Sequence, residues 1–496
     1  MSWKETAEPV LTRMPAVSQP DGHIPFKRKL MWTAGILVVY FYLTNVPVYG
    51  MGAGDDVFGQ FRSILAGEAG SILHLGIGPI VTASIVMQLL GGADLLGLDT
   101  NDPRDQVLYQ GLQKLLVVVM VCLTAFPMVF VGGFMQPDPV VADQLFGEGF
   151  MGADPIELVQ WLMFLQIAIG GILILFLDEI VSKWGIGSGI GLFIIAGVSQ
   201  RLLGGIFAWD ALEGERGLIP SWMDLAGEIY AGDVTPWTTD GLNELLLGQG
   251  GIVAIFTTVA IFAIVVYAES VRVEIPLSHA RVKGARGRFP VKLIYASVLP
   301  MILVRALQMN VVFFGQILNH QWAEMPTWLG TYDDQGTATG GFFYYMTPIH
   351  SPGDWMWWAG GQAAEMAVWQ VLMRVSVDMT FVVVGGGIMA IFWVETTGMG
   401  PKSTAQQIHR SGMQIPGFRQ NVGVIEKVLE RYIPQVTVIG GALVGFLAVA
   451  ANMMGTIGQV DGIGLLLTVS ITYKMYEEIA EEQLMEMHPM MRQMFG

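Results

Sequence analysis

From residue 55 to residue 90 the chain has the sequence DDVFGQFRSILAGEAGSILHLGIGPIVTASIVMQLL. Its first part, from Asp55 to Glu68, mixes charged residues with small and isolated apolar ones. We therefore expect a short polar helix there that neither spans lipid nor builds a soluble core. From about Gly76 the sequence is apolar enough to enter a membrane, and Pro79 with the preceding Gly76 and Gly78 indicates backbone that other parts of the protein or water must satisfy. A helix broken at membrane depth is typical of a pathway lining.

The composition indicates an integral protein of the cell membrane. With 53% hydrophobic and 14% charged residues, the 496-residue chain is too apolar for a soluble enzyme. A net charge of −16 favours a habitat of high salt, where screening weakens the repulsion between surface carboxylates. The lone Cys122 excludes an intrachain disulfide, and we expect it to be a small core residue.

Hydropathy over a window of about 20 residues predicts ten membrane-spanning helices. They cover residues 30–49, 76–92, 113–134, 158–177, 185–204, 251–271, 293–315, 371–394, 434–454 and 460–475. Most Lys and Arg residues fall in the N-terminal segment, the even-numbered loops and the C-terminal tail, whereas the long odd-numbered loops are acidic. The positive-inside rule then predicts that both termini are cytoplasmic.

This arrangement divides an all-α chain into two five-helix halves. Pro79 lies in the second span and Pro300 in the seventh, which is the second span of the second five, and each is expected to interrupt its helix. Interruptions at corresponding positions favour an inverted repeat with a pathway between the halves. The predicted segments are a cytoplasmic N-terminal segment (1–29), a first half (30–250) with a long external loop (205–250), a second half (251–475) and a cytoplasmic tail (476–496).

Two cytoplasmic loops are strongly basic. The loop at 272–292 concentrates six Lys and Arg residues, and its alternating apolar residues near Arg272 to Ile275 predict a short strand. The loop at 395–433 adds five more. Such loops suit an anionic partner, either nucleic acid or lipid headgroups, although the positive-inside bias alone also produces them.

Motifs for covalent catalysis, energy coupling, a metal or a cofactor are not found in the sequence. The glycine-rich GIGSGIG at 185–191 is expected to serve close helix packing. Arg374 and Asp378 lie four residues apart on one face of the eighth span, which favours a mutual ion pair over an ion pathway. Arg305 has no obvious partner, and we expect it to face a polar groove because a charge at mid-bilayer costs about 2.5–3.5 kcal/mol.

Several long strings resemble one known family. They are GIGPIVTASIVMQLL (76–90), KWGIGSGIGLFIIAGVSQ (183–200), YAESVRVEIPL (267–277), ARGRFPVKLIYASVLPMILVRALQMN (285–310), SGMQIPGFR (411–419) and LLLTVSITYKMYE (465–477). On these strings nearly the whole chain resembles archaeal members of the SecY/Sec61 alpha family, the large subunits of protein-conducting channels.

The resemblance implies ten helices around a central pore with a plug and a constriction. The plug would be the segment from Asp55 to about Glu68, including Val57, Phe58, Phe61, Arg62, Ile64 and Leu65. The constriction would be a ring of Ile77, Val81, Ile190, Ile194, Ile302 and Leu467. The i, i+4 spacing of the paired ring residues agrees with this assignment, because it directs each pair toward one point.

The resemblance also implies a lateral gate and a set of partners. The gate would lie between the second and seventh spans, with Thr82, Gln88 and Asn310 at its polar positions. Arg286, Arg288 and Arg419 would dock a ribosome. Further implied partners are small single-span subunits resembling SecE and Sec beta in a heterotrimer, signal sequences, nascent polypeptides and membrane lipid.

Two other classes of protein compete with this interpretation. A secondary transporter built on inverted repeats shares the ten spans, but it needs polar or ionisable groups where a solute binds. An intramembrane enzyme needs a nucleophile with a base, or paired acids, at depth. The proposed constriction, which we also call the waist, is a ring of aliphatic residues only, and this favours the channel.

Overall fold

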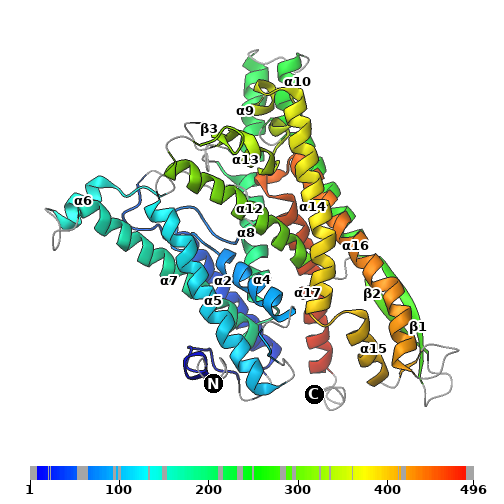
Figure 1. Cartoon of the computed structure of the whole chain (residues 1–496). Helices are drawn as coiled ribbons and strands as arrows, with labels where there is room; N and C mark the ends of the chain where they lie inside the picture. Colours follow the sequence, from blue (N-terminus) through cyan, green and yellow to red (C-terminus); the bar gives the residue numbers. More distant parts are fainter. Residues whose placement is uncertain are drawn as a thin grey trace.

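The chain folds into a bundle of long helices with a small sheet at one end (Figure 1). This computed structural model describes residues 8–20, 22, 24–52, 65–92, 96–98, 102–131, 135–147, 154–209, 216–231, 238–248, 251–279, 286–292, 298–322, 325–333, 337–359, 361–410, 413–414 and 421–487.

The ten predicted spans each correspond to one helix. They are α2 (Phe26–Thr44), α4 (Gly78–Gly92), α5 (Pro103–Phe130), α7 (Pro155–Trp184), α8 (Gly189–Phe207), α11 (Ile252–Ser270), α12 (Val298–Gln321), α14 (Val368–Thr396), α16 (Val422–Met454) and α17 (Gly462–Met487). Within the described residues, seven of these are long and apolar enough to cross a membrane: α5, α7, α8, α11, α12, α14 and α16. The chain is thus a multi-pass membrane protein, while length and hydropathy alone leave α2, α4 and α17 outside the count of spans.

Shorter elements connect these helices. They are α6 (Pro139–Phe146), α9 (Leu218–Ala231), α10 (Thr239–Leu247), β1 (Arg272–His279), β2 (Arg286–Lys292), β3 (Thr331–Tyr332), β4 (Ala338–Gly340), α13 (Gly341–Met346), η2 (Pro352–Asp354), η3 (Gln362–Glu365), α15 (Pro401–Arg410), β5 (Met413–Gln414) and η4 (Ile457–Gln459). Figure 1 shows β1, β2 and α15 at the lower end of the bundle, which we name the hairpin end, and α9 and α10 at the opposite end.

The two halves of the chain repeat one pattern of neighbours. In the first half α4 contacts α5, α5 contacts α7, α7 contacts α8, and α2 contacts both α7 and α8. In the second half α12 contacts α14, α14 contacts α16, α16 contacts α17, and α11 contacts both α16 and α17. The halves meet along two seams, one where α17 contacts α8 and α2, and one where α4 contacts α12 and α14. The repeated pattern is what an internal repeat of five helices produces.

The two prolines lie in the first turns of their helices, and the prediction that they interrupt spans is wrong. Pro79 is the second residue of α4, and Pro300 is the third residue of α12. The first-turn N–H groups of a helix have no intrahelical acceptor, so a proline there costs no hydrogen bond. The break in the first half lies before α4, where residues 72–77 form turns and the chain bonds to other segments, for example through Ile72 N–H to the Val46 carbonyl at 2.9 Å.

Glycines set the closest helix contacts, as predicted for GIGSGIG. A Cβ added at Gly191 of α8 would lie 2.9 Å from the Ile471 side chain of α17, and one added at Gly189 would lie 2.5 Å from Asp178 of α7. Only residues without a side chain allow this approach. Cys122, in contrast, is exposed on α5, so the prediction of a small core residue is wrong.

A separate small core lies at the hairpin end. The predicted strand is present as β1, which pairs antiparallel with β2 and also with β5 from the later basic loop, giving the strand order β2-β1-β5. Side chains of these strands and of α14, α15 and α16 form a buried cluster of Ile275, Val291, Val394, Ala405, Ile408, Ile425, Leu429 and Ile433. The two basic loops therefore form one unit with its own core, and we name β1, β2, β5, α15 and the part of α16 packed on them the platform.

Candidate functional site

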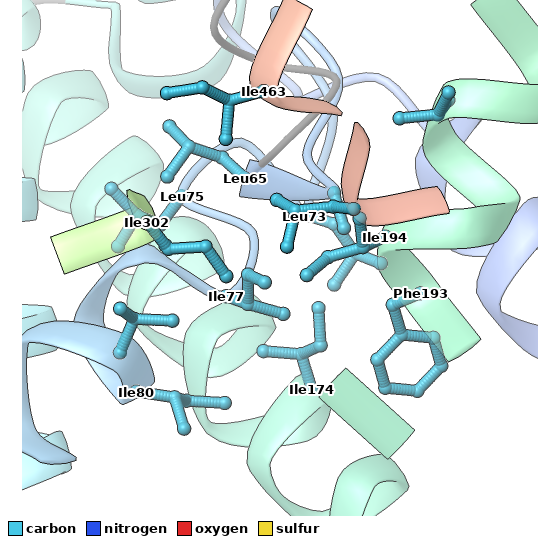
Figure 2. Packing of buried hydrophobic residues seen from close by; sticks show 14 of the residues in the cluster. Leu65, Leu73, Leu75, Ile77, Ile80, Ile174, Phe193, Ile194, Ile302 and Ile463 are labelled. Carbon is cyan, nitrogen blue, oxygen red and sulfur yellow. The ribbon is translucent and has the colours of Figure 1, made fainter. Parts of the chain in front are cut away.

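The six aliphatic residues predicted to form a ring belong to one packed cluster. Ile77, Val81, Ile194, Ile302 and Leu467 are buried in it, and the half-buried Ile190 packs against it. They come from both halves, because Ile77 immediately precedes α4, Val81 lies in the first turn of α4, Ile190 and Ile194 belong to α8, Ile302 to α12 and Leu467 to α17. Figure 2 shows Ile77, Ile194 and Ile302 converging with Leu65 and Ile463. An aliphatic cluster at the join of the halves offers no polar group to a solute.

Residues 65–67 close against the start of α4 at this cluster. The Ile77 N–H donates to the Leu65 carbonyl at 2.6 Å, and the buried Leu65 side chain packs among the same aliphatic residues. Gly76 has φ +53°, and a Cβ there would collide with the Leu65 carbonyl oxygen. Of the predicted plug residues, Asp55, Val57, Phe58, Phe61, Arg62 and Ile64 lie outside the described residues.

Tyr40 of α2 fixes the same segment from the other side. Its hydroxyl donates to the Ala66 carbonyl at 3.1 Å, and its ring stacks on Phe193 with 4.9 Å between centroids. Ala66 has φ +52°, a left-handed conformation that costs a residue with a Cβ about 1–2 kcal/mol. A strained residue held by a buried hydrogen bond marks a segment whose position the surrounding helices impose.

Two carboxylates, the half-buried Asp178 and the buried Asp461, orient helices that carry the proposed ring, and the sequence pattern did not single them out. The Asp178 carboxylate of α7 accepts from Ile190 N–H at 2.8 Å and so fixes the start of α8. In the second half, the Asp461 carboxylate accepts from Ile463 N–H at 2.8 Å at the start of α17. Carboxylates bonded to N-terminal amides stabilise these helix ends. For Asp461, the available signal was an acid directly before the first residue of a span, whereas Asp178 lies twelve residues before Ile190 and gave no such signal.

The proposed gate positions lie on the helices that meet at the second seam. Thr82 is half-buried on α4, and its hydroxyl donates to the Gly78 carbonyl at 3.0 Å within the same helix. Gln88 is half-buried near the end of α4, and Asn310 is exposed on α12. The structure thus places all three on α4 and α12, which contact each other.

The predicted ion pair between Arg374 and Asp378 is wrong, and so is the prediction that Arg305 faces a polar groove. The Arg305 guanidinium donates to the Asp378 carboxylate at 2.8 Å, and both side chains are fully buried between α12 and α14. Arg374 instead donates to the backbone carbonyls of Thr347 and Pro348, at 3.2 and 2.9 Å. The i, i+4 spacing put two opposite charges on one helical face, but the neighbouring helix supplied the stronger partner for the acid.

The platform presents basic residues, in part neutralised by neighbouring acids. Arg288 on β2 is largely exposed and pairs with Glu274 on β1 at 2.5 Å. Lys292 at the end of β2 pairs with Glu477 of α17 at 3.0 Å, which ties the platform to the bundle. Arg286 is also part of β2, whereas Arg419 lies outside the described residues.

Comparison with known proteins gives one family over the whole chain. The model of the SecY family matches residues 71–476, and the model of the plug domain of Sec61p matches residues 38–70. Protein translocase subunit SecY of Haloarcula marismortui is 68% identical over all of this chain and all of its own length. Protein translocase subunit SecY of Halobacterium salinarum is 66% identical over all of this chain and 99% of its own.

Comparison with solved structures points to the same family. One described as a protein conducting channel is 38% identical, with a TM-score of 0.75, and the match covers 97% of this chain and 98% of the other. Another, of Sec61 in the canine ribosome-channel complex from the endoplasmic reticulum, has a TM-score of 0.73 at 38% identity over the same shares. Family models, full-length relatives and solved structures therefore lead to one conclusion: the chain belongs to the SecY family.

Proposed function

We propose that the chain is the pore-forming subunit of a protein-conducting channel, which passes secretory proteins across the membrane and releases transmembrane segments sideways into lipid. The observation that carries this proposal is the aliphatic cluster where the two halves meet, closed by the segment at Leu65. A waist of branched aliphatic side chains excludes water when empty, yet it yields around a passing polypeptide without binding it. The proposal gives the chain no catalytic role.

Within this function, residues 55–68 act as the plug and the six aliphatic residues as the constriction. The contact of α4 with α12 acts as the lateral gate, with Thr82, Gln88 and Asn310 along it. An apolar signal sequence enters this contact because moving it from a watery groove into lipid is favourable by about 0.8 kcal/mol for each CH₂ group.

We further propose that the platform faces the cytoplasm, together with both termini, and docks a ribosome. The solved Sec61 ribosome-channel complex supports a docking role, and the basic residues of the platform suit RNA phosphates. Arg286, Arg288 and Arg419 are the proposed contacts. Small single-span subunits resembling SecE and Sec beta would complete a heterotrimer.

A transporter of small solutes is the weaker alternative. Such a protein needs polar or ionisable side chains converging at the pathway, whereas the six side chains at the proposed waist are all aliphatic. The buried charges Arg305 and Asp378 pair with each other between α12 and α14 and are not among the six residues of the proposed waist.

A crosslinking experiment tests the channel directly. In a Cys122→Ser background, a photo-reactive residue is placed at Ile190, and a ribosome-stalled secretory chain is added to the complex in membranes. We expect a crosslink to the stalled chain that depends on an intact apolar signal sequence. The matched control places the same residue at Ile169, an isoleucine of α7 that is exposed on the outside of the bundle, and gives no such crosslink.

Two outcomes would contradict the proposal. One is crosslinking at Ile190 and Ile169 to the same extent, because the pathway would then not pass the waist. The other is uptake of a small solute that depends on Ile190 while no stalled chain reaches that position, which would favour the transporter.

A further inference from the structure

The buried ion pair between α12 and α14 is part of a larger polar network that holds a connecting segment. Gln308 of α12 donates to the Asp378 carboxylate at 2.9 Å and also to the Met346 carbonyl at 2.9 Å. The second Asp378 oxygen accepts from Ile349 N–H at 3.3 Å. Together with the two bonds from Arg374, side chains of both helices thus hold the backbone from Met346 to Ile349, which we name the strap.

Each charge in this network has more than one role. Arg374 also lies over the Tyr344 ring, 5.1 Å from its centroid, so its guanidinium is fixed by two carbonyls and an aromatic face. His350 follows the strap, and burial lowers the pKa of its imidazole, which leaves the two arginines as the cations at neutral pH. A single acid, Asp378, therefore holds α12, α14 and the strap at once.

Apolar packing locks the same two helices one and two turns away. A Cβ added at Gly385 of α14 would lie 3.1 Å from a methyl group of Val304 and 3.9 Å from the Val304 Cβ. The Met301 side chain of α12 fills the space over Gly386 so closely that a Cβ there would collide with it. Shape and charge thus fix one arrangement of α12 on α14.

The face of α12 that carries the network differs from the face at the gate. At about 100° per residue, Asn310 points some 140° away from Arg305 around the helix. Asn310 is exposed, whereas Arg305 and Gln308 are fully buried. Movement at the gate face therefore does not require the network to open.

We propose that Arg305, Gln308 and Asp378 are positioning residues that make α12, the strap and α14 one rigid body, so that the lateral gate opens only between α4 and this body. The inference rests on the proposed channel function. It states which contact moves: α4 parts from α12 and α14 together, and α12 does not part from α14. Buried charge pairs suit this role because partial separation leaves a charge without its partner in a medium of low dielectric constant.

A disulfide between α12 and α14 tests the rigid body. In the Cys122→Ser background, Val304→Cys with Gly385→Cys places two thiols at a Cβ separation of 3.9 Å, within the range that a disulfide needs. We expect the oxidised complex to translocate a secretory chain as fast as the same complex after reduction. Translocation that is lost on oxidation and regained on reduction would overturn the proposal.

A second pair of cysteines tests the proposed gate independently of the rigid body. Gln88→Cys with Asn310→Cys, joined by a bis-maleimide long enough to span the two positions, ties α4 to α12 across the proposed gate and should stop the release of transmembrane segments into lipid. If this crosslink leaves release unchanged, the proposed gate is wrong whatever the first pair shows. If it stops release while the oxidised Val304–Gly385 pair does not, the rigid body is supported.

A third measurement asks whether the charges do the positioning. Arg305→Met with Asp378→Leu replaces the pair by apolar side chains, which cores of membrane proteins accommodate without leaving an unpaired charge. We expect the Val304–Gly385 thiols to oxidise several-fold more slowly in this background, because α12 and α14 no longer keep one arrangement. An unchanged oxidation rate would show that apolar packing alone suffices and would overturn the assignment of these residues.

Discussion

Gly76 is a position where a single methyl group should open the seal. Its φ of +53° is strained for any residue with a side chain, at a cost of about 1–3 kcal/mol. The new Cβ of Gly76→Ala would also collide with the Leu65 carbonyl that accepts from Ile77 N–H. We expect ion conductance of the resting channel in planar bilayers to rise. Gly91→Ala, in an α4 site where a Cβ lies 3.7 Å from its nearest neighbour, should leave conductance at the wild-type level.

Replacing Arg305 alone should lower the free energy of unfolding much more than replacing it together with Asp378. Arg305→Met leaves the Asp378 carboxylate buried without a cation, which costs about 3–5 kcal/mol of unfolding free energy. Adding Asp378→Leu removes the stranded charge, so most of that loss should return. Thermal unfolding of the detergent-solubilised complex measures both. A double variant no more stable than Arg305→Met would mean that the acid is not the source of the loss.

At single positions the sequence predicted most where a family resemblance and local spacing agreed. The pairs Ile77/Val81 and Ile190/Ile194 were implied by the resemblance, their i, i+4 spacing agreed with it, and the structure brings both pairs into one cluster. The partner of Asp378 was not predictable, because Arg305 precedes it by 73 residues and only the packing of α12 on α14 brings them together. Cys122 was misjudged for a related reason: an apolar helix in a membrane protein has no polar face to show which side is buried.

At the scale of elements, Ile275 should control the platform without affecting the bundle. Its side chain is 4% exposed in the small core, whereas Val273 on the same strand is 39% exposed. Ile275→Ala removes about 2–5 kcal/mol of packing. We expect faster proteolysis within the platform and weaker ribosome binding, with no change in unfolding of the membrane helices. Val273→Ala is the matched control, and equal effects of the two substitutions would contradict a separate platform core.

The elements themselves were largely predictable from hydropathy and alternation. All ten predicted spans coincide with helices, and the strand near Arg272 to Ile275 is β1. The pairing of β1 with β5 was not predictable, because β5 is two residues long and carries no alternation of its own. The prolines were placed correctly but misinterpreted, since a proline in a first turn and one inside a helix look the same when the helix start is unknown.

At the scale of the whole molecule, the proposed waist depends on both halves together. Ile190 comes from the first half and Ile302 from the second, so truncating both with Ile190→Ala and Ile302→Ala should wet the constriction and let small ions pass. Single-channel recording in bilayers measures the leak. Ile169→Ala with Ile264→Ala removes the same atoms from exposed sites on α7 and α11 and should leave ion conductance at the wild-type level. If the variant with Ile190→Ala and Ile302→Ala conducted no more ions than the wild type, the ring assignment would be refuted.

The three-stranded sheet has a consequence for the order in which the molecule is made. Strand β1 is synthesised before α12 and α14, but β5, which pairs with it at Ser278 and His279, follows both helices. The sheet cannot be completed until those two helices have been threaded into the membrane. A chain interrupted part-way through synthesis therefore lacks a finished platform, and under the proposed docking role only a nearly full-length chain would recruit a ribosome of its own.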